Sequence, residues 1–259
     1  DAAKLAGMFR DAGVDTVVFD IADVGARFYT YIWSMYTAMQ AAAATGAAFV
    51  VLDRPNPVGG QAFGPLLDPA FTSGVGRKPI TQQHGMTVGE LAGLFDEEFL
   101  PLEPEGTRLS QLDVVRVEGW RRDDLFSTTG LAWVPPSPNM PTPQTALVYP
   151  GTGLFEGTVL SEGRGTTRPF ETIGAPGIDW RLAEELNALG LPGVRFRETY
   201  FAPTFNKFTG LTCGGVQVHL TDQRSVDAIS TAVTMIVTAR RVYPTVFAWR
   251  EDNFVDKLF

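Results

Sequence analysis

The sequence lacks the features of several large protein classes. It has one cysteine, Cys213, and two histidines among its 259 residues, so no internal disulfide can form and a zinc site is not expected. No apolar run approaches the roughly 20 residues that span a bilayer, and no basic segment followed by an apolar run opens the chain. The net charge of −8, without a basic run, argues against nucleic acid or an anionic membrane as the main partner. We therefore expect a small or oligomeric ligand that binds in a pocket.

Several nucleotide and hydrolase motifs are also missing. The first apolar run is not followed by Gly-x-Gly-x-x-Gly, and the chain contains neither a Walker loop nor a Gly-x-Ser-x-Gly elbow. The apolar fraction of 44% and the charged fraction of 19% are typical of a globular protein. At this length the chain can bury a substantial core. The composition thus predicts a globular fold without a dinucleotide site.

Apolar runs and turn signals predict an α/β fold. Residues 14–21 and 48–53 form apolar runs of strand length, which is typical of strands buried on both faces. A helical pattern over 28–45 lies between them and ends at Gly46. Strand, helix and strand at this spacing indicate a βαβ unit with parallel strands. Residues 2–13 predict a helix that precedes the first strand.

The rest of the first half contains one clear helix start. Thr87 can cap a helix, and Glu90 three residues later completes a capping box. Residues 113–117 predict a short strand. The segment 135–143 carries five prolines in nine residues, which excludes a helix or a central strand there. It is the natural place for a division of the chain.

We expect this division to separate a lobe over residues 1–134 from a C-terminal lobe over 135–259. The C-terminal lobe shows a second series of apolar elements with helical or strand periodicity. These are a helix over 179–189, strands over 194–197 and 215–220, and a helix over 226–242.

Two polar clusters follow the first two predicted strands. Because parallel strands present their carboxyl ends at one edge of a sheet, and ligands bind there, the clusters should meet. Their candidate ligand-binding residues are Asp20, Asp23, Arg27, Tyr29, Arg54 and Asn56. Carboxylates, guanidinium groups and aromatic faces together suit a sugar. Alternatively, Asp23 and Asp53 cap turns and pair with Arg27 and Arg54.

A third polar segment, residues 156–171, alternates charged and hydroxyl residues with glycines. Glycine lets the backbone approach a ligand closely, and loops often carry functional groups. Glu156 and Glu162 offer acid–base chemistry, and Arg164 and Arg168 offer anion binding. The alternative is a surface loop held by Glu–Arg pairs.

The proline-rich segment and one histidine complete the candidates. Prolines fix Ser137 and Asn139, which suits hydrogen bonds to a ligand amide or hydroxyl, although a structural strut would look the same. His84 precedes the helix start at Thr87, and both a site role and a structural role remain open. We predict that four of these segments line one cleft: 20–31, 53–56, 137–139 and 162–168.

Six motifs, taken together and in chain order, resemble one protein family: DIADVGARFYTYI, LDRPNPVGG, HGMTVGELA, WVPPSPNMPT, YPGTGLFEGT and SEGRGTTRPFE. The family is the exo-β-N-acetylmuramidases of glycoside hydrolase family 171, long catalogued as a bacterial domain of unknown function. The resemblance covers nearly the whole chain. It implies a Rossmann-like larger lobe, a smaller C-terminal α/β lobe and a cleft between them.

The resemblance also implies an activity. Family members release N-acetylmuramic acid from the non-reducing ends of peptidoglycan-derived glycans, so muropeptides are the expected partners and no cofactor is expected. An extracellular or periplasmic location is favoured over a cytoplasmic one. A non-catalytic muropeptide-binding protein that uses the same cleft is the alternative. A nucleotide-using α/β enzyme is a third possibility, which the missing glycine fingerprint disfavours.

The sequence departs from the family at both ends. Family members carry a stretch before the position of Asp1, with a Gly-Pro-Glu-His-Gly type motif whose glutamate is a leading catalytic candidate, and they continue beyond EDNFVDKLF. We therefore expect the first lobe to lack its N-terminal part, the second lobe to be truncated at its end, and activity to need the missing piece.

The resemblance assigns roles to the candidates. Glycoside hydrolysis ordinarily needs two carboxyl groups that flank the scissile bond. Glu162 is the first choice and Asp23 the second, and Arg164 beside Glu162 favours a charged role for that carboxylate. Arg164 and Arg168, with Arg54 in reserve, are the candidates to bind the lactyl carboxylate of N-acetylmuramic acid, since arginine can hold both carboxylate oxygens.

Overall fold

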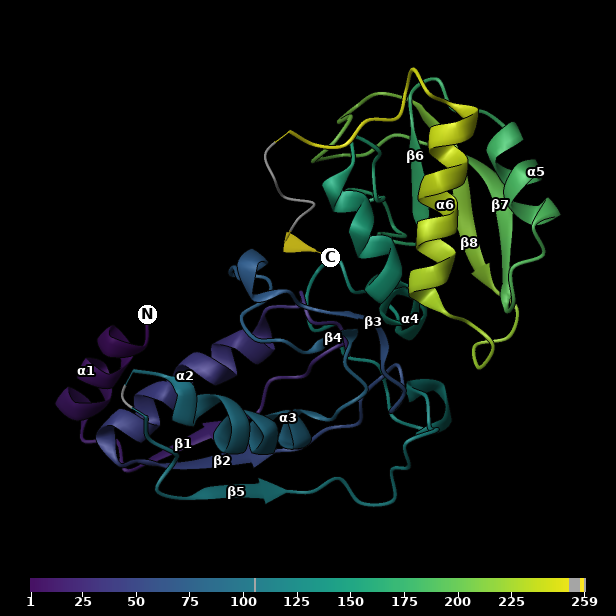
Figure 1. Cartoon of the computed structure of the whole chain (residues 1–259). Helices are drawn as coiled ribbons and strands as arrows, with labels where there is room; N and C mark the ends of the chain where they lie inside the picture. The colour runs from purple at the N-terminus through teal and green to yellow at the C-terminus, as the bar shows by residue number, and fades with distance from the viewer. Residues whose placement is uncertain (105, 252–256, 259) are drawn as a thin grey trace. The chain divides into compact units, whose positions relative to one another are not determined.

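The computed structural model describes residues 1–104, 106–251 and 257–258. The chain forms two compact units, each with its own sheet and helices (Figure 1). Unit 1 consists of Asp1–Ala62 and Leu66–Leu131, and unit 2 of Phe63–Pro65 and Ala132–Phe259. The architecture is mixed α/β, with a parallel sheet in the first unit.

Unit 1 contains a three-stranded parallel sheet in the order β1-β2-β5. The strands are β1 (Thr16–Phe19), β2 (Ala48–Leu52) and β5 (Leu112–Val115). The helix α2 (Tyr31–Thr45) joins β1 to β2 and packs against both, which confirms the predicted βαβ unit. The helix α3 (Val88–Leu94) packs against β2 and β5, and α1 (Ala2–Ala12) packs against α2. In unit 1, α2 and α3 lie on one side of the sheet (Figure 1).

The ends of the unit 1 helices follow from local chemistry. Gly46 adopts a left-handed conformation, with φ of 75°, and ends α2 as predicted. The capping box at Thr87 is confirmed: its hydroxyl accepts from the Glu90 amide, and the Glu90 carboxylate accepts from the Thr87 amide. The helix α2 begins three residues later than predicted. The backbone of Arg27 instead pairs with that of Gln82, where its amide donates to the carbonyl at 2.8 Å.

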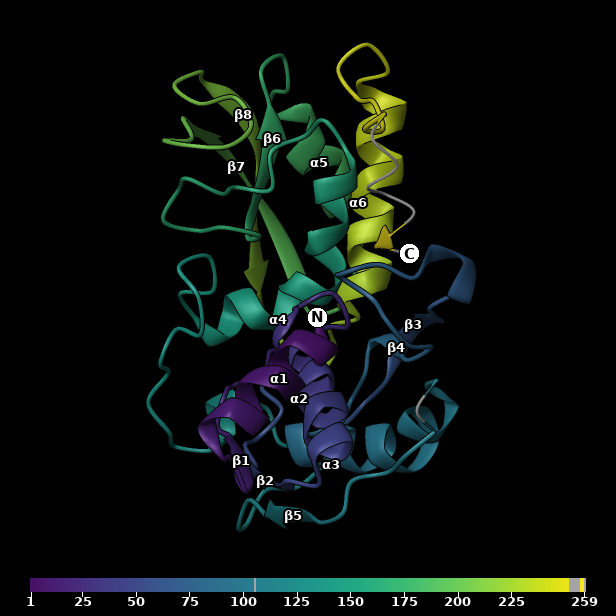
Figure 2. The ribbon, with the colours of Figure 1, turned by 90° about the vertical axis from the view of Figure 1, so that its left-hand side faces the viewer.

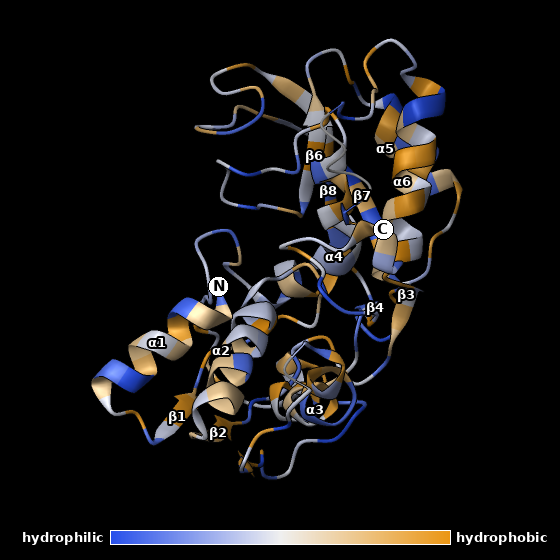
Figure 3. Ribbon diagram, turned by 60° about the vertical axis from the view of Figure 1, so that its left-hand side comes forward, coloured by the Kyte–Doolittle hydropathy of each residue, from blue (hydrophilic) through white to orange (hydrophobic). Residues whose placement is uncertain are grey.

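The prediction that the first strand is buried on both faces is wrong. Phe49 and Val51 of β2 are fully buried against α2 and α3. Val18 of β1 and Val115 of β5, however, are 58% and 57% exposed. The strands are apolar along their length, as Figure 3 shows for β1 and β2, but the described residues of unit 1 place helices over one side of the sheet only. A continuous apolar run in the sequence therefore does not show whether helices cover one face of the sheet or both.

Unit 1 also has shorter elements around this core. They are β4 (Thr81–Gln83), the 3₁₀ turns Pro69–Phe71, Leu100–Leu102 and Phe126–Thr128, and a π-helical turn at Phe95–Phe99. The strand β3 (Phe63–Leu66) pairs with β4, and its first three residues are assigned to unit 2. The π turn continues α3 and brings Phe95 into the core, where its ring lies 5.6 Å from that of Trp33.

Unit 2 contains a three-stranded antiparallel sheet in the order β6-β8-β7. Its elements are α4 (Pro143–Thr152), the 3₁₀ turn Gly153–Gly157, β6 (Thr172–Ala175), α5 (Arg181–Ala188), β7 (Val194–Phe201), β8 (Cys213–Leu220) and α6 (Ala228–Val242). The helices pack together on one side of the sheet (Figure 2). The predictions of α5, β7, β8 and α6 are confirmed, whereas β6 and α4 were not predicted.

The helix α4 corrects the prediction for the proline-rich segment. Its first residue is Pro143, the last proline of that segment. Proline is tolerated at the first helical position because the missing amide proton would be unpaired there. Thr142 caps the helix by accepting from the Thr145 amide at 3.1 Å. The helix also accommodates Pro150 in its interior, which the sequence pattern did not predict.

The strand β6 escaped prediction because it is short and contains glycine. A Cβ atom on Gly174 would lie 2.1 Å from the Gly214 carbonyl oxygen of β8, so the close approach of these strands requires glycine.

Among the described residues, none of the helices is both long and apolar enough to pass through a membrane.

Candidate functional site

The carboxyl ends of β1 and β2 meet at one edge of the unit 1 sheet, as predicted. Asp20 follows β1, Arg54 follows β2, and their side chains form an ion pair. Arg54 thus pairs with Asp20 and not with Asp53, which corrects the alternative interpretation. The side chains are 45% and 50% exposed, and an exposed pair of this kind contributes at most about 1 kcal/mol. Both therefore remain accessible to a ligand.

Asp23 pairs with His84, and not with Arg27. One carboxylate oxygen, Oδ2, accepts from the Gly25 amide at 2.7 Å and lies 2.9 Å from His84 Nε2. His84 Nδ1 accepts from the Met86 amide at 3.2 Å, which assigns the ring proton to Nε2 and makes that nitrogen the donor to Asp23. The side chains of Asp23 and His84 are 6% and 0% exposed. The sequence placed both residues in the site but did not pair them.

The second oxygen of Asp23, Oδ1, is buried and has no hydrogen-bond partner among the described residues. Leaving a buried acceptor unsatisfied costs about 1–3 kcal/mol. Native structures contain few such atoms, and each one calls for an explanation, such as a bound water, an ion or a catalytic role. Asp23 Oδ1 therefore has acceptor capacity left for a ligand.

Arg27 and Asn56 hold the backbone around this pair. The Arg27 side chain is fully buried and donates from Nη1 to the Ile80 carbonyl at 2.9 Å, and burial lowers the pKa of Arg27 to about 10. Asn56 donates to the Met86 carbonyl at 2.9 Å and accepts from the Val58 amide at 3.1 Å. Both candidates thus bind the protein's own main chain.

Tyr29 lies next to this group of side chains. It is 9% exposed, and its ring meets that of Tyr31 edge-on, with 5.1 Å between the ring centres. The predicted aromatic face is therefore mostly buried.

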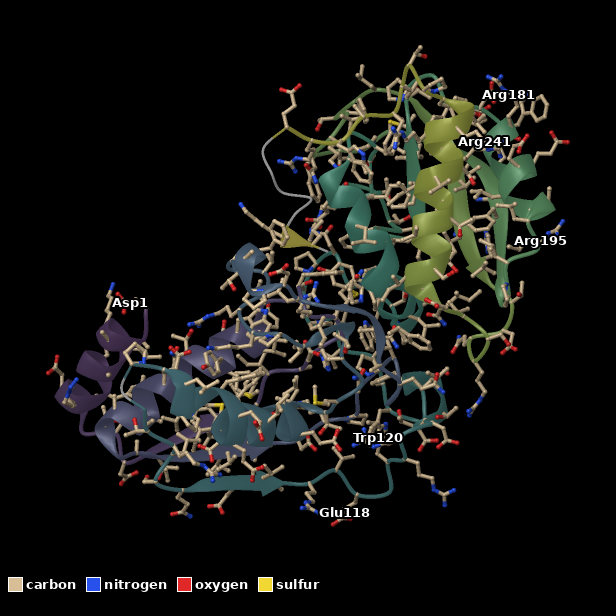
Figure 4. The ribbon with its side chains drawn as sticks, viewed as in Figure 1. Asp1, Glu118, Trp120, Arg181, Arg195 and Arg241 are labelled. Atoms are coloured by element: carbon tan, nitrogen blue, oxygen red, sulfur yellow. The ribbon has the colours of Figure 1, made fainter. Side chains whose placement is uncertain are left out.

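A hollow of about 400 Å³ opens beside the carboxyl ends of β2 and β5 within unit 1. Asp53 lies on it and caps the start of α3, since its carboxylate accepts from the Gly89 amide at 2.8 Å and from the Thr87 hydroxyl at 2.9 Å. Arg116 and Trp120 line the same hollow, and Figure 4 labels Trp120. The Trp120 indole nitrogen is buried without a partner among the described residues. The hollow thus lies at the carboxyl ends of parallel strands, where ligands bind in open α/β sheets.

In unit 2, Glu162 lies at the centre of a group of donors. Its side chain is 1% exposed. Lys207 Nζ donates to Oε2 at 2.8 Å, Asn206 Nδ2 donates to Oε1 at 2.9 Å, and Arg164 Nε lies 3.4 Å from Oε1. Lys207 also donates to the carbonyls of Phe155 and Leu160, at 2.9 Å each. The Glu162 carboxylate is therefore fixed in place by two cations and an amide.

Arg164 is held from several sides. Its Nη2 donates to Glu156 Oε1 at 2.5 Å, and its guanidinium carbon lies 4.9 Å from the centre of the Phe170 ring. Burial disfavours its charge, but Glu156 and Glu162 outweigh this and raise the pKa of Arg164. The interpretation of this segment as a loop held by Glu–Arg pairs is thus correct for Arg164, although the loop is buried at Glu162.

Arg168 has more freedom than Arg164. Its side chain is 48% exposed, and Nη1 lies 3.4 Å from Glu171 Oε2, a long contact for a hydrogen bond. Glu171 is buried, and its other oxygen accepts from the Thr145 hydroxyl at 2.6 Å. Most of the donor capacity of Arg168 is therefore open to a ligand.

Ser137 and Asn139 lie in a turn in which the Met140 amide donates to the Ser137 carbonyl at 3.0 Å. Both residues are half-buried. The prediction that they line one cleft together with residues of the first lobe stays a prediction.

Both units match models of one family. Residues 3–144 match the N-terminal domain, and residues 147–259 the C-terminal domain, of the exo-β-N-acetylmuramidase NamZ. The chain belongs to the NamZ family. It is 50% identical over 247 residues, 95% of its length, to the peptidoglycan β-N-acetylmuramidase NamZ of Bacillus subtilis strain 168.

Two solved structures of DUF1343 family proteins from Bacteroides fragilis NCTC 9343 share the fold. One has a TM-score of 0.85 and 35% identity over 92% of this chain, and the other a TM-score of 0.74 and 30% identity over 94%. The chain spans 58% of the length of the Bacillus relative and 61% and 64% of the two solved chains.

Three residues of this NamZ-family chain were missed by reasoning from the sequence. Lys207 and Asn206 lie in a loop without periodicity, and Glu171 lies at the end of the polar segment but was not chosen. No signal in the sequence could have found Lys207, because it lies 45 residues from Glu162 and the burial of Glu162 was not predicted.

Proposed function

We propose that this chain belongs to a glycoside hydrolase that releases N-acetylmuramic acid from the non-reducing ends of peptidoglycan-derived glycans. The observation that carries the proposal is the match of both units to the NamZ domains, with 50% identity to a peptidoglycan β-N-acetylmuramidase. Peptidoglycan fragments are the proposed substrates. An extracellular or periplasmic location would place the enzyme where such fragments arise.

Asp23 is a candidate for the carboxyl group that exchanges a proton during catalysis. A general acid or base must be free to gain and lose a proton, and one oxygen of Asp23 has no partner among the described residues. His84 holds the other oxygen at 2.9 Å and so fixes the orientation of the carboxyl group. This arrangement supports Asp23 as a reacting group and His84 as a positioning residue.

Glu162 suits a different role in the same proposal. Lys207, Arg164 and Asn206 all present donors to it, and such an environment matches a negative charge that stays in place. A fixed anion can stabilise the positive charge that develops on the sugar ring in the transition state of glycoside hydrolysis. Glu162 is therefore proposed to act through its charge.

The proposal is tested by an assay of the full-length protein on a chromogenic β-N-acetylmuramic acid glycoside. The matched N-acetylglucosamine glycoside serves as the control substrate. Release of the chromophore from the muramic acid glycoside alone is the expected result. Tight binding of the same glycoside without turnover would contradict the proposal and support a non-catalytic muropeptide-binding protein.

A further inference from the structure

A second hollow, of about 230 Å³, lies within unit 2 beside Arg168. It is bounded by residues of α4, of β8 and of the loop that contains Arg168. Sites for drug-sized ligands usually measure about 300–1,000 Å³. This hollow is smaller, and it therefore suits one substituent or part of one sugar, and not an oligosaccharide.

Three side chains on the walls of this hollow have hydrogen-bond donors to spare. Arg168 has a single long contact, at 3.4 Å, to Glu171. The side-chain amide of Gln144 makes no hydrogen bond to any residue that the structure describes. The Gln217 carbonyl oxygen accepts from Arg197 at 2.9 Å, so its NH₂ group still has donors to offer.

The carboxylate on the wall, that of Glu171, already has partners. Glu171 Oε1 accepts from the hydroxyls of Thr145 and Thr142, at 2.6 and 3.2 Å. Its other oxygen is the one near Arg168. A ligand acceptor that carries negative charge would therefore match the guanidinium group of Arg168.

The hollow also has a small apolar surface. Val148 and Val218 line it, and both are 3% exposed. A ligand that fits combines a carboxylate, other oxygen acceptors and a small apolar group.

We propose that this hollow binds the lactyl group of N-acetylmuramic acid, with Arg168 on the carboxylate and Gln144 and Gln217 on neighbouring oxygens. The proposal rests on the proposed function, which supplies this sugar as the substrate. The lactyl group is an ether-linked propionate whose methyl group would lie against Val148 and Val218. N-acetylglucosamine lacks the whole group, so the hollow would distinguish the two sugars.

Arg164 is the weaker choice for this role. Its guanidinium group already contacts the carboxylates of Glu156 and Glu162. A ligand carboxylate would add a third negative charge beside the same guanidinium group. Arg168 has one partner at long distance and is nearly half exposed, so it can accept a second carboxylate without losing the first.

Equilibrium binding to the full-length protein tests the proposal without the need for turnover. Three probes are compared by calorimetry: N-acetylmuramic acid, its lactyl amide, and N-acetylglucosamine. We expect the wild type to bind the acid most tightly, the amide less tightly and N-acetylglucosamine least. Arg168→Ala should lower affinity for the acid by about ten- to a hundredfold, the range for a charge-assisted hydrogen bond, and leave N-acetylglucosamine unchanged.

Two further variants separate charge from geometry. Arg168→Lys keeps the charge but loses the planar fork, so it should recover part of the preference for the acid. Gln144→Ala should weaken binding of the acid and of the amide by similar, smaller factors. Arg240→Ala is the control, because Arg240 is exposed on α6 and makes no hydrogen bond or ion pair among the described residues.

Each outcome decides one question. Equal binding of the acid and N-acetylglucosamine by the wild type, or an unchanged preference in Arg168→Ala, overturns the assignment of the hollow. If Arg168→Ala fails to fold, the Arg168→Lys and Gln144→Ala variants decide in the same way. The protein could also prefer the acid without cleaving its glycoside. That result would contradict the proposed function but support the assignment of the hollow to the lactyl group.

Discussion

The two units each bury a carboxylate, but they surround it differently. In unit 1, Asp23 meets an imidazole and a backbone amide through one oxygen and keeps the other unpaired among the described residues. In unit 2, Glu162 meets an ammonium group, a guanidinium group and an amide. Asp23 thus keeps one oxygen open to a ligand, whereas both oxygens of Glu162 are saturated with donors. The roles proposed above follow this difference, with Asp23 as the reacting group and Glu162 as the fixed charge.

The largest effect should come from Asp23→Asn. Asparagine can keep the hydrogen bonds from His84 and Gly25 but cannot exchange a proton, so turnover of the full-length enzyme on the muramic acid glycoside should fall about a thousandfold, within the range for loss of general acid–base catalysis. KM should change little, and kcat and KM are measured together. Asp11→Asn, at an exposed position of α1, is the control. A loss of turnover below tenfold would remove Asp23 from the reaction.

The saturated carboxylate should instead couple strongly to its lysine. Lys207→Met leaves the buried Glu162 charge without its closest cation, which should lower the free energy of unfolding by about 3 kcal/mol. Urea denaturation measures this, with the exposed Lys4→Met as control. In a double-mutant cycle, Glu162→Gln should recover part of the loss. Strictly additive effects would show that the pair does not interact in the folded protein.

Glu162→Gln tests whether the charge of the unit 2 carboxylate contributes to turnover. The change preserves shape and removes the charge, so turnover should fall by about a hundredfold while binding of N-acetylmuramic acid changes much less. Single-turnover kinetics and calorimetry separate the two quantities. Unchanged turnover would move attention to Asp23 and Glu156. A pure loss of affinity would assign Glu162 to binding.

The last difference between the units concerns the burial of residues on their sheets. Cys213 begins β8 and is fully buried, and burial raises its pKa from 9.0 to about 11. The folded state thus retains the proton, so this contribution to stability is complete below about pH 9 and is lost as pH rises through 11. At pH 8 the thiolate fraction, and with it the alkylation rate, should be about a hundredfold below that of an unfolded control.

A cysteine on the other sheet provides the matched comparison. Val18 of β1 is 58% exposed, so Val18→Cys should be alkylated at nearly the rate of a free thiol. Equal rates at Cys213 and at the introduced cysteine would show that the two sheets are covered to the same extent.

The local parts of the fold were predictable because they depend on neighbours in sequence. The capping box at Thr87 and the stop at Gly46 each follow from residues within one turn. The strand β6 was not predictable, since its glycine is explained only by the approach of β8. Likewise, the apolar character of Val18 does not show whether a helix packs over its face of the sheet.

The candidate site was predictable as a set of residues but not as a set of pairs. The sequence singled out Asp23, His84 and Glu162. It could not show that His84 binds an aspartate 61 positions away, or that Lys207 binds Glu162 across 45 positions. The predicted pairs of neighbouring charges, Asp23 with Arg27 and Asp53 with Arg54, do not form. Asp23 pairs with His84 and Arg54 with Asp20, which are 61 and 34 positions away.

The most direct test of the account is the product released from a defined disaccharide by the full-length enzyme. One substrate carries N-acetylmuramic acid at its non-reducing end, and the other carries N-acetylglucosamine there, with the same β linkage. The account predicts free N-acetylmuramic acid from the first substrate and no cleavage of the second. Cleavage of both at similar rates, or of neither, would contradict it.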